Sequence, residues 1–152
     1  MQIETSRFGL LAYEKEDLIH FAGGLFGFEH LKDYLVLPLE NNPAFYWLQS
    51  VEDGEVAFLL TDPFLFFPSY TVELDEEIRK KLAVEKREQV AVYVIVTVPS
   101  ADVRDMTANL IGPLVINLAS RRGEQYILYG TDYHTKHLLF TNQGSQAGGA
   151  GG

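Results

Sequence analysis

The stretch Q-V-A-V-Y-V-I-V-T-V, residues 89 to 98, decides the fold of this chain. Valine occupies every second position from Val90 to Val98, and the residues between them are Ala, Tyr, Ile and Thr. A period of two is typical of a β-strand, because successive side chains point to opposite faces of a sheet. Both alternating sets are largely apolar, so the stretch predicts a central strand that is covered on both sides.

Similar short runs recur along the chain, separated by the turn signals N-N-P, E-D-G and R-R-G. This spacing is typical of sandwiches and closed barrels. It favours a mainly β, single-domain fold, an antiparallel β-barrel or sandwich with one or two short helices. The further strands are predicted at 2–6, 9–13, 18–21, 34–39, 45–50, 56–61, 70–73, 114–119 and 125–129.

Helical signals are few. Leu74, Ile78 and Leu82 recur at four-residue spacing, with acidic residues at the start of the repeat and basic residues in its last turns. That order complements the helix dipole and predicts one short helix. A second helical segment is predicted near 133–139. The chain after Phe140 has no charge and no large apolar side chain, so we expect a folded domain over 1–140 and a flexible tail or linker over 141–152.

Composition excludes several classes of site. The chain has no cysteine, which rules out disulfides, zinc–thiolate sites and thiol nucleophiles. Its start lacks a basic region followed by an apolar run, and no apolar stretch approaches the roughly 18 residues of a spanning helix. We therefore expect a cytoplasmic protein that does not contact a membrane.

The net charge of −9 comes from the middle third of the chain. Residues 33–78 contain ten carboxylates and no Lys, Arg or His, while the remainder is close to neutral. A solvated acidic surface is one interpretation, and a patch that steers a basic protein partner is the other. Both argue against direct binding of nucleic acid, because a phosphate backbone needs a basic footprint.

Motifs of catalysis and metal binding are weak. The stretch G-G-L-F-G-F, 23–28, lacks the Gly-Lys-Ser/Thr ending of a phosphate loop, and it predicts a turn with glycine at positive φ. His134 and His137 stand three apart with Lys136 between them, which favours a structural or interface role over metal ligation. The sequence therefore predicts no enzyme, no metal and no cofactor.

Two other stretches are interpreted differently from each other. D-P-F-L-F-F-P-S-Y, 62–70, carries four aromatic residues beside two prolines that prevent a regular central strand. For any single one of these rings a core position is the favoured interpretation. Four aromatics in a loop cannot easily all turn inward, however, and those left outside favour a protein interface. The stretch T-A-N-L-I-G-P-L-V-I-N, 107–117, is expected to have a structural role in the scaffold and not to form a binding site. Asn109 is predicted to cap a turn or bond buried backbone, Pro113 to enter a strand, and Asn117 to find partners for its amide inside that strand.

Several stretches together resemble the FliW family of flagellar assembly factors. They occur in family order and cover the chain to about residue 140. The Gly-Pro at 112–113 stands where Ala-Pro is expected, and this change leaves the proline turn in place. The matching stretches are F-G-L-L-A-Y with D-L-I-H-F (8–21), G-L-F-G-F-E (24–29), F-Y-W-L-Q-S (45–50), V-A-F-L-L-T-D-P (56–63), T-A-N-L-I-G-P-L-V-I-N (107–117) and R-R-G-E-Q-Y-I-L (121–128).

The resemblance implies a partner switch that involves no catalysis. FliW-like proteins bind cytoplasmic flagellin. When flagellin is exported, the freed protein binds CsrA, a small basic dimer that represses translation of flagellin mRNA, and relieves the repression from outside the RNA groove of CsrA. A monomer is expected when the protein is free. An acidic antagonist of a basic protein also agrees with the charge map.

The expected contact to CsrA combines acidic residues with apolar anchors. The flagellin site is expected at an apolar groove or strand edge, without assigned residues. Two alternatives stay open: an adaptor or chaperone for another basic or amphipathic partner, and a small-molecule-binding barrel, which would need an enclosed pocket. The acidic contact residues are Glu73, Asp75, Glu76 and Glu77, and the possible anchors are Phe64, Phe67 and Tyr70.

Overall fold

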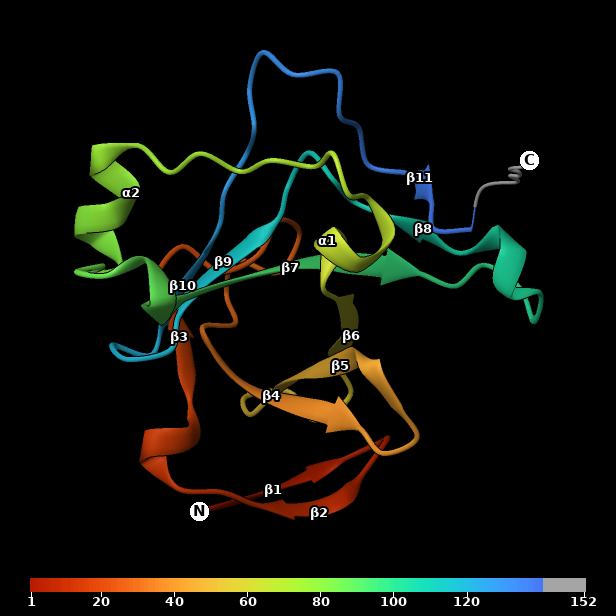
Figure 1. Ribbon diagram of the computed structural model, residues 1–152. Coiled ribbons are helices and arrows are strands. Elements are labelled where there is room, and N and C mark those ends of the chain that lie inside the picture. The colour runs from red at the N-terminus through yellow and green to blue at the C-terminus, as the bar shows by residue number, and fades with distance from the viewer. Residues whose placement is uncertain (141–152) are drawn as a thin grey trace.

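In the computed structural model, which describes residues 1–140, the strands close into a barrel (Figure 1). Adjacent strands pair in the order β7, β6, β5, β4, β3, β10 and β9, and β9 closes the ring by pairing with β7. The predicted mainly β barrel is therefore confirmed, while the predicted tail at 141–152 lies outside the described residues. The barrel strands are β3 (Ile19–Phe21), β4 (Asp33–Leu39), β5 (Asn42–Ser50), β6 (Ala57–Thr61), β7 (Val90–Thr97), β9 (Leu114–Asn117) and β10 (Arg122–Gln125).

One pair of barrel strands departs from the antiparallel expectation. β3 and β10 run parallel, with Arg122 opposite His20 and Gly123 opposite Phe21. Every other neighbouring pair in the ring is antiparallel. The ring contains an odd number of strands, so it cannot close with alternating directions throughout, and the parallel pair is where this constraint is met.

β7 is the central strand that its sequence predicts. Val94 and Val96 are buried in one cluster, together with Phe45. Tyr93 and Ile95, on the opposite face, pack against the barrel core. The alternation therefore places two different apolar clusters on the two faces of one strand.

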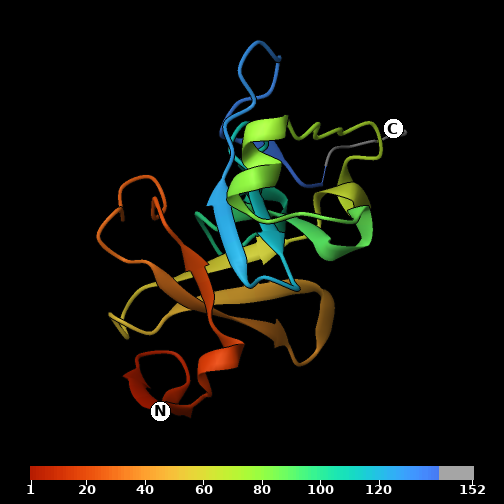
Figure 2. The same ribbon diagram turned by 90° about the vertical axis from the view of Figure 1, so that its left-hand side faces the viewer.

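Short elements complete the structure outside the ring (Figure 2). β1 (Gln2–Thr5) and β2 (Gly9–Ala12) form a separate antiparallel hairpin at the N-terminal end. β8 (Thr107–Ala108) continues the sheet beyond β7, and β11 (His137–Leu138) pairs with β8. Neither β8 nor β11 is predicted as a strand from the sequence, because two residues are too few to show a period.

The helices agree only partly with the sequence. α2 (Glu76–Lys81) is the predicted helix, whereas α1 (Pro63–Phe66) is an additional single turn. The predicted helix near 133–139 is wrong, because that segment is irregular and contains β11. Single 3-10 turns occur at Lys15–Asp17, Arg87–Gln89 and Val103–Asp105. No helix within residues 1–140 has the length and apolar character needed to cross a membrane.

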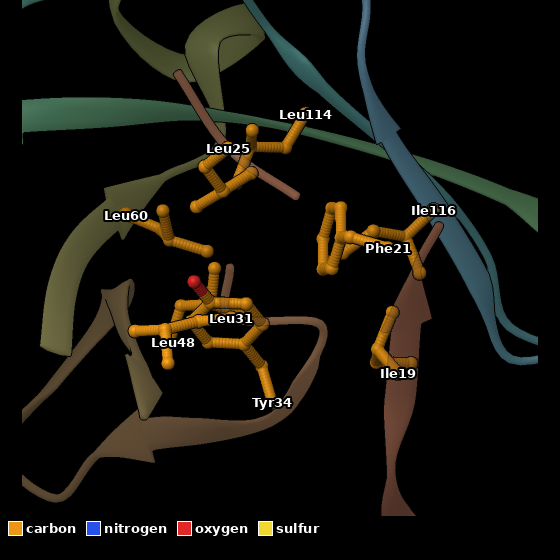
Figure 3. Close-up of a cluster of buried hydrophobic side chains, with 9 residues drawn as sticks. All are labelled: Ile19, Phe21, Leu25, Leu31, Tyr34, Leu48, Leu60, Leu114 and Ile116. Atoms are coloured by element: carbon orange, nitrogen blue, oxygen red, sulfur yellow. The ribbon is translucent and has the colours of Figure 1, made fainter. Parts of the chain in front are cut away.

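Apolar side chains fill the barrel interior (Figure 3). Phe21 and Tyr34 pack edge to face, with ring centroids 5.5 Å apart. Gly123 lies under the Phe21 ring, and a Cβ there would approach the ring carbons to 2.7 Å. The interior therefore holds packed side chains where the small-molecule-barrel alternative would need an enclosed pocket. The cluster consists of Ile19, Phe21, Leu25, Leu31, Tyr34, Leu48, Leu60, Leu114 and Ile116.

Both asparagines of the 107–117 stretch are scaffold residues. Asn109 Oδ1 accepts a hydrogen bond from Gly112 N–H at 3.0 Å and closes a turn that leaves the β7 edge. Asn117 is fully buried, and its Nδ2 donates to the carbonyl oxygens of Leu82 at 2.8 Å and Ala83 at 3.1 Å. This amide ties the C-terminal end of α2 to the barrel wall, which confirms the predicted scaffold role.

The glycine-rich stretch is a turn, as predicted. Gly24 and Gly27 have φ of +69° and +86°. A Cβ at Gly24 would lie 2.6 Å from the Glu29 Cα, so the backbone crossing at this position requires glycine.

Candidate functional site

The segment between α1 and α2 is extended but belongs to no sheet. Thr71, Glu73 and Asp75 are exposed. Val72 turns inward against the cluster that contains Phe45, Val94 and Val96. Leu74 packs against a smaller buried cluster formed by Ile78, Leu82 and Val115. The predicted strand at 70–73 is thus wrong, although the period of two is real. The alternation directs one row of side chains into the core and leaves the other row, with two carboxylates, facing solvent.

Asp75 organises the start of α2. Its Oδ1 accepts a hydrogen bond from Ile78 N–H at 2.9 Å, and its Oδ2 accepts one from the Tyr126 hydroxyl at 3.1 Å. These bonds lower the pKa of the Asp75 carboxyl, with the Ile78 N–H as the largest cause. Asp75 is therefore an N-cap as well as a surface charge.

An acidic groove of about 890 Å³ opens beside this segment. One wall is the row Thr71, Glu73 and Asp75, and the other runs from the end of β10 at Glu124 along the following chain to Tyr133. The predicted strand at 125–129 is shifted, because β10 ends at Gln125 and the chain beyond it forms this wall. Within the described residues, the groove lining contains no Lys, Arg or His. Its carboxylates are Glu73, Asp75, Glu77, Glu124 and Asp132.

Aromatic side chains accompany the carboxylates in the groove. Tyr129 is 85% exposed and Phe26 is 60% exposed, and both belong to the lining. Tyr126 and Tyr133 line it as well. Carboxylates next to exposed aromatic rings can bind Lys and Arg side chains through ion pairs and cation–π contacts together.

The four predicted acidic contacts do not all lie together. Glu73, Asp75 and Glu77 line the acidic groove, whereas Glu76 lies on another side of α2. There its carboxylate is 3.9 Å from Lys80 Nζ, one turn along the helix. The structure therefore separates Glu76 from the other three acids.

The three predicted aromatic anchors have different environments. Phe64 is 44% exposed and lines a second cleft on the other side of Glu73. Phe67 is half-buried and lies edge-on to His137. Tyr70 is only 4% exposed, and its hydroxyl donates to Leu110 O at 2.6 Å. Burial raises the Tyr70 pKa. This side chain is a core residue and offers no exposed ring, contrary to the expected anchor.

Glu124 and Asp132 are groove residues that the sequence did not single out. They lie 51 and 59 residues after Glu73, outside the acidic third, and no local pattern connects the two segments. Within residues 1–140, Glu124 is the one groove carboxylate that forms an ion pair, since Lys81 Nζ lies 3.8 Å from its Oε1.

The histidines do not form a metal site within the described residues. The His134 and His137 rings stack with centroids 3.8 Å apart, and His137 Nε2 accepts a hydrogen bond from His134 N–H at 3.0 Å. Burial, and then the neighbouring His134, lower the pKa of His137. The contacts of this pair are those of a structural element beside β11.

Comparison with known proteins gives one consistent result. A family model described as FliW protein matches residues 2–139. A flagellar assembly factor FliW from Moorella thermoacetica is 51% identical over 140 residues, which cover 92% of this chain and 89% of the relative. A flagellar assembly factor FliW from Anoxybacillus flavithermus is 44% identical over 140 residues, which cover 92% of this chain and 95% of that relative.

The fold agrees with a solved structure of the same description. A crystal structure of the flagellar assembly factor FliW superposes with a TM-score of 0.85 at 39% identity, and covers 92% of this chain and 97% of that one. The matched residues 2–139 include the barrel strands, both α-helices and the whole lining of the acidic groove. This chain belongs to the FliW family of flagellar assembly factors.

Proposed function

We propose that the protein acts by binding two protein partners in the cytoplasm, without catalysis. One partner is flagellin, and the other is the basic translational repressor CsrA, which the protein binds when it is free of flagellin. Binding antagonises the repressor and thereby couples flagellin synthesis to flagellin export. The proposal draws on family membership, on the charge of the chain and on the acidic groove.

The observation that carries the CsrA part is the clustering of five carboxylates in one groove. They come from two segments far apart in sequence, so their convergence is a product of the fold. Like charges brought together repel one another in the free protein, and a basic partner would relieve that repulsion. A groove of this kind supports fast, salt-sensitive association with a cationic surface.

The same charges supply a means of antagonism. When the groove faces a basic partner, its carboxylates neutralise some of the cations that attract RNA and repel the phosphates of an approaching RNA. The effect needs no overlap with the RNA site, because unscreened Coulomb forces extend over roughly a Debye length, about 8 Å at physiological salt.

Charge reversal inside and outside the groove tests this site. Glu73→Lys with Glu77→Lys should weaken CsrA binding at least tenfold in calorimetry, and the loss should shrink as salt is added. Asp75 is left intact, because its reversal would also remove the N-cap of α2. Glu76→Lys with Glu55→Lys is the matched control, because both exposed acids lie outside the groove lining.

The control also examines the predicted role of Glu76. If the control pair weakens CsrA binding as much as the groove pair, the groove is not the contact and a diffuse acidic surface replaces it. If the unmodified protein binds neither purified CsrA nor purified flagellin, the partner switch itself is wrong. If both partners bind, a competition assay determines whether one displaces the other.

A further inference from the structure

The edge of β7 that faces β6 is open over its first residues. Main-chain N–H and C=O groups of successive strand residues point to alternate sides. Asn109 N–H donates to Ile95 O at 2.9 Å, and Leu118 N–H donates to Gln89 O at 2.8 Å. The main-chain N–H and C=O groups of odd-numbered residues therefore point toward β8 and β9. Those of even-numbered residues, including Val92, point to the β6 side.

β6 ends before it reaches Val92. Thr61 pairs with Val94, so the same register would place Pro63 opposite Val92. Proline has no N–H, and Asp62 instead starts α1 by accepting a hydrogen bond from Phe64 N–H at 2.9 Å. Within the described residues, the N–H and C=O of Val92 thus have no partner on this side.

An apolar cleft of about 700 Å³ lies along this open edge. Figure 1 shows the segment between α1 and α2 running above β7, and its residues Val72 and Leu74 contribute to the lining. Unpaired strand groups beside apolar walls are the combination that accepts an added β-strand, since main-chain bonds supply affinity and alternate side chains fill the walls. The apolar lining is completed by Phe64, Val84, Val90 and Val92.

The rim of the cleft carries more basic than acidic side chains, although the chain as a whole is acidic. Arg79, Lys86 and Arg87 line it, against the two acids Glu73 and Glu85. Five of the twelve Lys and Arg residues of the chain fall within residues 79–87, in a protein of net charge −9. A basic partner would be opposed here, whereas an apolar segment with carboxylates fits both the walls and the rim.

We propose that the β7 edge at Val92 accepts an extended segment of flagellin as an additional strand, with apolar side chains against the cleft and carboxylates toward Arg79, Lys86 and Arg87. This inference rests on the proposed function for the identity of the partner. Glu73 lines both this cleft and the acidic groove, so the two partners would meet at one residue.

Amide hydrogen exchange on the unmodified protein tests the strand addition. Saturation with purified flagellin should slow exchange of the Val92 amide at least tenfold more than that of Val94, which is already paired to β6. Binding of flagellin with no preferential protection of Val92 overturns the strand addition and leaves the partnership standing. Absence of flagellin binding overturns the partnership, and the inference with it.

Reversal of the rim charge gives an independent readout. Lys86→Glu with Arg87→Glu should weaken flagellin binding at least tenfold while CsrA binding changes less than twofold. Lys15→Glu with Lys136→Glu carries the same charge change at positions outside the cleft lining, and should bind flagellin as the unmodified protein does. Circular dichroism checks that both variants are folded. If the rim and control variants then bind flagellin with equal affinity, the proposal that carboxylates of the bound segment contact the rim is overturned.

Discussion

The hydroxyl of Tyr126 donates a hydrogen bond to Asp75 Oδ2 at 3.1 Å and joins the two walls of the acidic groove. The other oxygen of this carboxylate accepts from Ile78 N–H at the start of α2. Both bonds favour the ionised form, so one residue fixes the groove geometry and contributes to its charge. The groove is therefore formed before any partner arrives.

Acid stability should depend on Asp75. Its folded-state pKa is lowered by the Ile78 N–H and then by Tyr126. A group of this kind contributes stability that is fully present above its unfolded pKa, about 3.9, and is lost as pH falls through the lower folded value. Asp75→Asn keeps an N-cap oxygen but cannot titrate. Its unfolding temperature should therefore fall less than that of the unmodified protein as pH decreases below about 4.

The control for this measurement is Glu55→Gln. It removes an exposed carboxylate whose side chain makes no hydrogen bond within the described residues. Its unfolding temperature should follow the pH curve of the unmodified protein. An Asp75→Asn curve with that same slope would contradict the assigned role of the Asp75 carboxylate.

Removal of the Asn117 amide should be among the more damaging single changes. Asn117→Ala removes two donated bonds to the end of α2 and two accepted bonds, from Ala119 N–H and Ser120 N–H. These groups would be left buried or half-buried without partners, at a cost of about 2–4 kcal/mol in the free energy of unfolding. Urea denaturation measures the change.

Asn109→Ala serves as the comparison within the same stretch. Its side-chain oxygen accepts one bond, from Gly112 N–H, in a half-buried turn. The expected cost is about 1 kcal/mol. Equal costs for the two variants would show that the tie between Asn117 and α2 contributes little.

Local periodicity was sufficient for most of the barrel and insufficient for its pairing. β7 and α2 follow from the spacing of Val and Leu, because each buries a regular row of side chains. The segments at 70–73 and 126–129 lie in predicted strands as well, yet neither belongs to a sheet among the described residues. Whether an extended segment finds a partner strand depends on residues distant in sequence, which a local pattern does not contain.

The candidate site shows the same limit more strongly. Charge counting located Glu73, Asp75 and Glu77, because they are close together in the chain. It could not locate Glu124 and Asp132, whose position in the groove depends on the path after β10. The anchor role expected for Tyr70 failed for a related reason. The ring is buried with its hydroxyl bonded to the Leu110 carbonyl, which is distant in sequence, and this contact cannot be predicted from the proline-rich loop alone.

Gly123→Ala should destabilise the barrel through one contact. The added Cβ would meet the Phe21 ring at 2.7 Å, in a cluster that is fully buried. Overpacking of this kind costs about 1–3 kcal/mol. The penalty should fall in a Phe21→Leu background, where the smaller side chain leaves room, and a double-mutant cycle by urea denaturation measures that coupling. If the costs of Gly123→Ala and Phe21→Leu simply add in the double variant, the strain does not come from the contact with the Phe21 ring.

Tyr70→Phe separates a core role from a contact role. The change removes only the hydroxyl, so the Leu110 carbonyl loses its 2.6 Å donor in an environment where both residues are at most 4% exposed. An unpaired buried carbonyl costs about 1–3 kcal/mol, which should appear as a lower urea midpoint. Affinity for either partner should stay within twofold, because the ring cannot reach solvent. Phe64→Ala should lower stability only slightly but weaken flagellin binding, because the Phe64 ring is 44% exposed and lines the cleft. A Tyr70→Phe variant that keeps its stability but loses a partner would return Tyr70 to the interface.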